Sequence, residues 1–262
     1  MEVHLNIENQ ARSVSQTQQY EQCGWRFYLQ RVERVVPRPA AWSSHGTAFH
    51  SAVEVYEKSG RALPVEAVVQ LFSDRYSELV NKGLDKEPNT DRWLAAGRPG
   101  GADIEHRYVL GQEQAAYYVR WAAENPTRTW TTPDGQPGVE LYFLVKLGGV
   151  QVRGFIDQLV QDDDGSVRPR DWKTGSTKSK FQLQTYAVAI RKLYNIEVLR
   201  ADWYLAKEGR LSRPVKLEDL REEEVGERFA DMDAAVKRGD FPARPGFQCR
   251  FCDVSHACTF RK

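Results

Sequence analysis

Gly154 to Tyr186 reads GFIDQLVQDDDGSVRPRDWKTGSTKSKFQLQTY, and this stretch decides the fold. An apolar run that carries Asp157 is followed by an acidic turn containing Gly165, and a second extended run carries Asp171 and Lys173. An Asp-Gly pair between two extended runs is a hairpin signal, so the runs are expected to pair as neighbouring strands. The stretch therefore predicts a β-hairpin, then a basic loop and a helix.

The hairpin brings charged side chains to one end of a sheet. Residues two apart in a strand point to the same face, so Asp171 and Lys173 project together and Trp172 points away. Asp157 joins them from the partner strand. Carboxylate oxygens are hard ligands that suit Mg²⁺ or Mn²⁺, and a lysine beside such an ion can orient water and stabilise charge on phosphorus. The pattern is typical of metal-dependent hydrolysis.

One feature of the second strand is unusual. Pro169 lies inside it, flanked by Arg168 and Arg170. Proline cannot donate a hydrogen bond to a ladder, and it argues against a regular central strand. We therefore expect this strand to be short, or to pair on one side only before Asp171.

Three motifs in this stretch resemble the PD-(D/E)XK nuclease superfamily in its RecB-like branch: Gly154-x-x-Asp157, Asp171-x-Lys173-Thr174-Gly175 and Gln182-x-x-x-Tyr186. Each motif alone is weak, but their order at hairpin and helix spacing is fairly specific. The resemblance implies an α/β fold with a restriction-endonuclease-like core, in which helices flank a mixed central sheet. It also implies one nuclease domain over residues 1–262 and an Mg²⁺- or Mn²⁺-dependent deoxyribonuclease.

An earlier helix carries a histidine of the same family. Residues 45–59 read HGTAFHSAVEVYEKS, with His50, Glu54 and Glu57 on one helical face. A polar helical face is usually only solvated. The spacing Gly46-x-x-x-His50-x-x-x-Glu54, however, resembles the first-helix motif of RecB-like nucleases. The resemblance implies that His50 binds the catalytic metal, while Glu54 orients a bound water or His50 itself.

The resemblance assigns catalysis to four side chains: His50, Asp157, Asp171 and Lys173. The first three would bind the divalent ion, together with the carbonyl of Trp172, and the lysine would position the attacking water.

Further residues are expected near the DNA. The resemblance implies that Gln182 and Tyr186 hold the DNA backbone near the scissile phosphate. Lys178 and Lys180 add positive charge before the helix, although each lysine is equally well explained as solvated. Glu140 begins the preceding predicted strand, and it is either another site carboxylate or an exposed edge charge.

Four cysteines suggest a second metal centre. Cys23 is followed far along the chain by CRFCDVSHAC, which holds Cys249, Cys252 and Cys258. Cys23 alone is best read as a buried free thiol, but the four together can bind one centre. Zinc and a [4Fe–4S] cluster both take four thiolates, and spacing alone does not separate them. His256 lies between the thiolates and could replace one of them.

The family resemblance favours the cluster. One cysteine near the N-terminus and three near the C-terminus, bracketing a RecB-like core, resemble the iron–sulphur exonucleases of the CRISPR-associated RecB type, their phage relatives and AddB. A cluster-binding region over 240–262 plus Cys23 is thus implied, with a structural [4Fe–4S] cluster that staples the chain ends. The chain departs from the family at Gly24 and Asp253, where proline is common.

Composition bounds the remaining possibilities. The 262 residues are 41% hydrophobic, enough for an ordinary core, and a net charge of +1 means that any DNA contact must use local patches. No apolar run approaches a membrane span and no secretory signal is visible, so a cytoplasmic protein without membrane contact is expected. Residues 60–135 lack motifs and are expected to be a helical insertion, with helices over 64–82 and 103–125.

The resemblance implies an exonuclease acting on single-stranded DNA or free DNA ends, in recombination, repair, phage DNA processing or CRISPR spacer acquisition. No G-x-x-x-x-G-K-[ST] sequence is present, so a helicase partner, like an integrase partner, would be a separate protein. The alternative is a non-catalytic DNA-binding or assembly module of a recombination or adaptation complex. A zinc-binding regulator would leave Asp157, Asp171 and Lys173 without a role.

Overall fold

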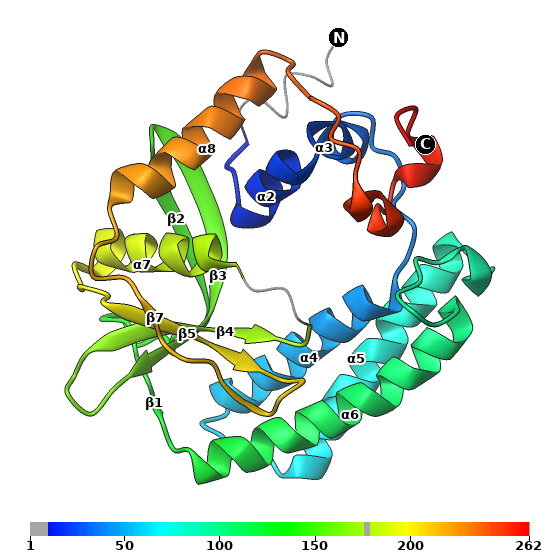
Figure 1. Cartoon of the computed structure of the whole chain (residues 1–262). Coiled ribbons are helices and arrows are strands. Elements are labelled where there is room, and N and C mark those ends of the chain that lie inside the picture. Colours follow the sequence, from blue (N-terminus) through cyan, green and yellow to red (C-terminus); the bar gives the residue numbers. More distant parts are fainter. Residues whose placement is uncertain (1–9, 176–178, 262) are drawn as a thin grey trace. The chain divides into compact units, whose positions relative to one another are not determined.

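The computed structural model describes residues 10–175 and 179–261, and Figure 1 labels their elements. The chain divides into two compact units. The larger unit comprises Pro39–Tyr142 and Phe155–Asp219. The smaller unit comprises Met1–Arg38, Phe143–Gly154 and Leu220–Lys262. The expectation of one nuclease domain over 1–262 stays a prediction.

Three long helices of the larger unit pack against one another: α4 (Ala41–Lys58), α5 (Val65–Lys86) and α6 (Gly100–Glu124) (Figure 1). A short 3₁₀ turn, η1 (Thr90–Arg92), precedes α6. Each long helix buries an aromatic ring in their common core, Phe49, Phe72 and Tyr118 respectively. The two helices expected within 60–135 are thus present, while their status as an insertion stays a prediction. No helix in the described ranges is long and apolar enough to cross a membrane.

The strands form a mixed sheet with the order β1-β3-β4-β5-β6, in which β2 also pairs with β3 and β7 with β5. Strands β3 and β4 are antiparallel, and β4 and β5 are parallel. The bounds are β1 (Arg128–Thr129), β2 (Val139–Leu147), β3 (Val150–Gln161), β4 (Val167–Lys173), β5 (Arg200–Leu205), β6 (Arg210–Leu211) and β7 (Val215–Lys216).

Helices cover this sheet in the larger unit. Trp172 of β4 and Tyr204 of β5 are buried in the same core as α4, α5 and α6. Helix α7 (Lys180–Tyr194) contacts β4 and β5 as well, and its first turn is capped by the Ser179 hydroxyl, which accepts from the Gln182 N–H at 3.2 Å. The mixed sheet flanked by helices confirms the expected α/β class and agrees with a PD-(D/E)XK core.

The predicted hairpin is β3 and β4. The N–H of Gly165 donates to the Asp162 carbonyl at 2.9 Å, and Gly165 has a φ of 84°, which glycine adopts without penalty. Pro169 pairs only with β3, opposite Leu159, because pairing with β5 begins at Arg170. The expectation that the proline strand pairs on one side before Asp171 is confirmed.

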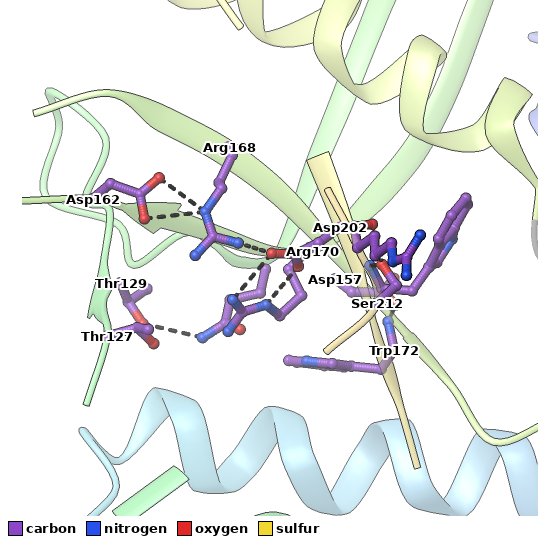
Figure 2. A network of polar contacts seen from close by, with 12 residues as sticks. Thr127, Thr129, Asp157, Asp162, Arg168, Arg170, Trp172, Asp202 and Ser212 are labelled. Carbon is purple, nitrogen blue, oxygen red and sulfur yellow. Dashed lines mark hydrogen bonds and ion pairs between the residues drawn. The ribbon is translucent and has the colours of Figure 1, made fainter. Parts of the chain in front are cut away.

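The arginines around Pro169 are held by the buried Asp202 and the half-buried Asp162 (Figure 2). Arg170 is fully buried, and its Nε donates to Asp202 Oδ1 at 2.7 Å. Arg168 also pairs with Asp202, and its Nε lies 2.8 Å from Asp162 Oδ2. The Arg170 guanidinium lies over the Trp121 ring, 5.4 Å from its centroid. Burial, helped by the charge of Arg168, lowers the pKa of Arg170 to about 9.

We expect Asp202→Asn to lower the free energy of unfolding by about 3–5 kcal/mol, because it leaves the buried Arg170 without its counter-charge. Urea unfolding followed by circular dichroism measures the change. Asp163→Asn, at an exposed acid of the hairpin turn, is the matched control and should unfold at the wild-type midpoint. A wild-type midpoint for Asp202→Asn would contradict this role of the ion pair.

The smaller unit is built from helices α2 (Val14–Gln22), α3 (Gly24–Arg31) and α8 (Glu222–Lys237). Ser13 begins α2 with a capping box. The buried Arg12 pairs with Asp233 of α8 at 2.8 Å. Apolar residues from these segments form one small core: Tyr20, Phe27, Val32, Met232, Ala235 and Val236. Two 3₁₀ turns follow, η2 (Phe247–Phe251) and η3 (Ser255–Ala257).

Candidate metal centre

Three metal-ligating side chains of the larger unit converge. His50 comes from α4, Glu140 from β2 and Asp157 from β3, and their donor atoms all lie within 4.8 Å of one another. His50 Nδ1 is 3.7 Å from Glu140 Oε1 and 3.5 Å from Asp157 Oδ2. One imidazole nitrogen beside carboxylate oxygens is a donor set that suits Mn²⁺ or Mg²⁺.

The backbone of Trp172 orients two of these side chains. His50 Nε2 lies 2.8 Å from the Trp172 carbonyl oxygen, which can only accept, so Nε2 carries a proton. The other ring nitrogen, Nδ1, therefore faces the carboxylates. The Trp172 N–H donates to Asp157 Oδ2 at 2.8 Å. The carbonyl thus acts here as the hydrogen-bond partner that fixes a ligating imidazole, and its own role as a ligand stays a prediction.

Glu140 is the group member that sequence reasoning did not select. It has a φ of 46°, which is uncommon for a residue other than glycine and costs on the order of 1–3 kcal/mol. Such strain persists where surrounding structure imposes it, and here it accompanies a carboxylate directed at His50. The sequence offered only its place on the strand before the hairpin, which did not decide between a site carboxylate and an edge charge.

A second set of polar contacts links four of the predicted site residues in series. Lys173 Nζ lies 2.7 Å from Asp171 Oδ2 and donates to Gln182 Oε1 at 3.0 Å. Gln182 Nε2 in turn donates to the Tyr186 hydroxyl at 2.7 Å. Gln182 and Tyr186 are one helical turn apart on α7, so this helix holds the Lys173 ammonium beside Asp171. The structure therefore brings these four side chains together.

Asp171 carries a buried carboxylate oxygen without a hydrogen-bond partner among the described residues. Its side chain is fully buried, and within the described part of the chain Oδ1 makes no hydrogen bond. A buried carboxylate oxygen without a partner is costly. Asp171 is not one of the three residues whose donor atoms lie within 4.8 Å of one another. The residues present nevertheless fit a hard divalent ion, and ligation by Asp171 stays a prediction.

Burial and neighbouring charges shift the pKa values of the site's own side chains. Burial raises the pKa of Asp157 to about 7, and the Asp171 carboxylate adds to the shift while His50 opposes it. Burial disfavours the imidazolium of His50, but Asp157, Glu140 and Asp171 outweigh it and raise the His50 pKa to about 9. Burial also raises the pKa of Asp171 against the opposing Lys173. The metal-free site therefore retains protons that a metal ion must displace.

We expect Mg²⁺ affinity to rise with pH between about 6 and 9, because the ion must displace the protons that Asp157 and His50 hold in the metal-free site. Their raised pKa values also mean that the folded, metal-free site binds protons more tightly than the unfolded chain. The stability contributed by these protons is lost as pH rises through about 7 for Asp157 and about 9 for His50. Calorimetric titrations in buffers of different ionisation enthalpy should show proton release at pH 7. An affinity that is flat with pH, without proton release, would contradict the shifts.

Three further residues were predicted near the site: Glu54, Lys178 and Lys180. Lys180 begins α7 and is exposed, so its contact with DNA stays a prediction. Lys178 lies outside the described residues. Glu54 pairs with Lys58 at 2.6 Å, the ordinary ion pair of neighbouring helical turns.

The four cysteines are half-buried and belong to the smaller unit. Among the described residues, no three of their sulfur atoms lie within 4.8 Å of one another. A tetrahedral zinc with Zn–S bonds of about 2.3 Å would place its sulfurs about 3.8 Å apart. In the described structure, no three of these sulfurs therefore lie close enough to share a single tetrahedral ion.

Other contacts of the smaller unit do connect the cysteine-bearing segments. Cys23 Sγ accepts the N–H of Arg244 at 3.5 Å. Arg26 pairs with Asp253 at 3.0 Å, and Arg38 donates to the Cys252 carbonyl at 3.3 Å. The N-terminal helices and the C-terminal segment are thus joined by contacts of the cysteines and of residues next to them.

Comparisons with known proteins identify the family that this chain resembles. The profile of the PD-(D/E)XK nuclease superfamily matches residues 11–259. The Gene 69 protein of Mycobacterium phage L5 is 36% identical over 96% of this chain and 97% of its own. The Gene 69 protein of Mycobacterium phage D29 is 38% identical, with the same coverage of both chains. A solved structure titled "Crystal structure of SSO0001" aligns over 82% of this chain and 84% of that chain, with a TM-score of 0.33 and 16% identity, which is too distant to inform the fold or function.

Proposed function

Because this chain belongs to the PD-(D/E)XK nuclease superfamily, a family of metal-dependent nucleases, we propose that it is an Mg²⁺- or Mn²⁺-dependent exonuclease that hydrolyses phosphodiester bonds at single-stranded DNA ends. The observation that carries this proposal is the convergence of His50, Glu140 and Asp157, whose donor atoms lie within 4.8 Å of one another. The phage relatives favour a role in phage DNA processing or recombination.

The proposed ligands of the ion are the imidazole of His50 and the carboxylates of Glu140, Asp157 and Asp171. A divalent ion held there supplies Lewis-acid stabilisation of the phosphate oxygens and makes a water molecule more acidic. The backbone of Trp172 orients two of these proposed ligands. The Trp172 N–H fixes Asp157 and its carbonyl fixes His50, so β4 orients both ligands from its backbone.

Lys173 is proposed to position the attacking water. Its ammonium is held between Asp171 Oδ2 and Gln182 Oε1, at 2.7 Å and 3.0 Å, so one of its three donors remains for water or a phosphate oxygen. A fixed ammonium stabilises negative charge in the transition state without reorganising. Gln182 and Tyr186 are proposed to contact the DNA backbone from the same side.

Cleavage of end-labelled DNA tests this function. Wild-type protein with Mg²⁺ or Mn²⁺ should shorten a linear single-stranded oligonucleotide from an end, while Asp171→Ala should not. A circular single strand of the same sequence has no ends and should stay intact. Cutting of the circle would indicate an endonuclease, and binding without cutting by wild-type protein would indicate the non-catalytic assembly module.

The proposal for the smaller unit is a structural [4Fe–4S] cluster on Cys23, Cys249, Cys252 and Cys258. It is supported by the order of the four cysteines along the chain and by the packing of the segments that carry them. The cluster would then stabilise this unit and take no part in hydrolysis.

We expect protein purified without oxygen to be brown, with iron and acid-labile sulphide in equal amounts, and Cys23→Ser to lose most of both. Iron and sulphide assays with a visible absorption spectrum measure this. His256→Ala is the control, and it should keep the cluster because four thiolates suffice. A colourless protein with one tightly bound zinc ion would overturn the cluster in favour of a Cys₄ zinc site.

A further inference from the structure

Two aromatic side chains of the larger unit are exposed to solvent and in contact with each other. Tyr142 is 49% exposed and Phe155 is 54% exposed. Their ring centroids are 5.4 Å apart, with the planes inclined at 58°. Aromatic rings of this size usually contribute to a core or an interface. This pair forms an apolar surface that the described fold does not cover.

The two rings border the candidate metal centre. Tyr142 follows Glu140 by two positions on β2, and Phe155 precedes Asp157 by two positions on β3. Buried and less buried side chains alternate along β2, which places Glu140 and Tyr142 on one face despite the unusual φ of Glu140. On β3, Phe155 and Asp157 are two residues apart and point to the same face. Each ring is therefore the neighbour, on the same face of the same strand, of a proposed metal ligand.

Buried neighbours hold both rings on this face. Leu141 is 6% exposed and Ile156 is fully buried, and both point to the opposite side of the sheet. A slip of either strand by one residue would exchange these core side chains with the rings. The rings are thus presented to solvent by the same strands that position Glu140 and Asp157.

Negative charge next to the two rings affects which part of a DNA strand can bind to them. The neighbouring carboxylates of Glu140, Asp157 and Asp171 repel a phosphate backbone wherever a cation does not neutralise them. A neutral contact must then supply part of the affinity for DNA. Stacking of a base on an aromatic side chain is worth about 1–3 kcal/mol and depends little on sequence.

We propose that Tyr142 and Phe155 form a stacking platform for a nucleobase of the strand being cut, and that this platform makes the site prefer single-stranded over double-stranded DNA. The inference rests on the proposed nuclease function. A base in single-stranded DNA has a free face that can lie on the rings. A paired base in a duplex is already stacked on its neighbours, so the platform gains nothing from it. The platform also sets which phosphate reaches the metal centre.

The test measures binding in an Asp171→Asn background, so that the DNA is not cut. Fluorescence anisotropy compares a single-stranded oligonucleotide with versions carrying one abasic position at successive distances from the end. With both rings present, abasic substitution near the end should weaken binding about 5- to 150-fold. With Tyr142→Ala and Phe155→Ala combined, the intact oligonucleotide should bind as weakly, and the abasic position should have no further effect.

Two controls make this experiment specific. Tyr142→Phe keeps a stacking ring and should bind like the background protein. Tyr108→Ala removes an aromatic ring that is 37% exposed on α6, and it should change neither single-strand binding nor the abasic effect.

Several results would overturn the platform. The ring-less variant could keep the full abasic effect, or it could lose single-strand and duplex binding equally. These outcomes are distinct from failure of the proposed function, which would appear as wild-type protein that does not cut DNA. The binding comparison still tests the platform in that case.

Discussion

Replacing Asp171 by asparagine is expected to lower the rate of DNA cleavage by about 10³-fold or more, while the protein remains folded. The change keeps the shape of the side chain but removes a proposed anionic ligand and the counter-charge of Lys173. Metal assistance contributes several kcal/mol to the transition state, and each 1.36 kcal/mol corresponds to about tenfold in rate. Single-turnover cleavage of an end-labelled oligonucleotide with saturating Mg²⁺ measures the loss.

The folded state of this variant provides a second readout. Burial raises the pKa of Asp171, so its ionised form is less stable in the fold than in water. A neutral asparagine should therefore leave the metal-free unfolding temperature equal or higher. Asp163→Asn, at the exposed acid in the turn of the same hairpin, should retain wild-type cleavage. A fast Asp171→Asn enzyme, or one that fails only because it unfolds, would argue against the proposed ligand.

Replacing Lys173 by alanine is expected to lower the cleavage rate by about 10²–10³-fold, the usual cost of losing one preorganised stabiliser of transition-state charge. Substrate binding should largely survive, because the lysine acts on the developing charge and the water more than on the bound DNA. The expected signature is a lower kcat with little change in KM. Single-turnover rates and anisotropy binding on the same oligonucleotide separate these quantities.

Two further variants sharpen the lysine test. Lys173→Arg keeps the charge, but the planar guanidinium does not fit between Asp171 and Gln182, so activity should remain far below wild type. Lys216→Ala removes an exposed lysine of β7 and should leave the rate unchanged. Equal losses of binding and of cleavage in Lys173→Ala would instead indicate a general DNA contact.

Much of the fold could be predicted because local rules and distant contacts agree in this chain. The Asp-Gly turn predicted the β3–β4 hairpin, and the missing N–H of Pro169 predicted a strand that is short or pairs on one side only before Asp171. Strand alternation predicted that Asp171 and Lys173 lie on one face, and the structure places their side chains in contact. The sequence did not reveal the Asp202 partner of Arg170, because that contact joins parallel strands across a crossover.

The parts that could not be predicted depend on geometry that periodicity does not encode. Glu140 joins His50 through a backbone conformation with φ of 46°, which no pattern in VELYFLVK indicates. The Trp172 carbonyl was expected as a ligand, while its hydrogen bond to His50 follows from the approach of α4 to β4. For the cysteines, spacing predicts a shared centre but does not determine how closely the sulfurs lie.

The most direct measurement is anomalous diffraction from a crystal of the protein grown or soaked with Mn²⁺. We expect a single strong peak in the larger unit, bonded to His50 Nδ1 and to oxygens of Asp157 and Glu140 at about 2.0–2.6 Å, with Asp171 completing the site. A Mn²⁺ ion bound elsewhere, with these four side chains making no contact to it, would contradict the proposed hydrolytic centre.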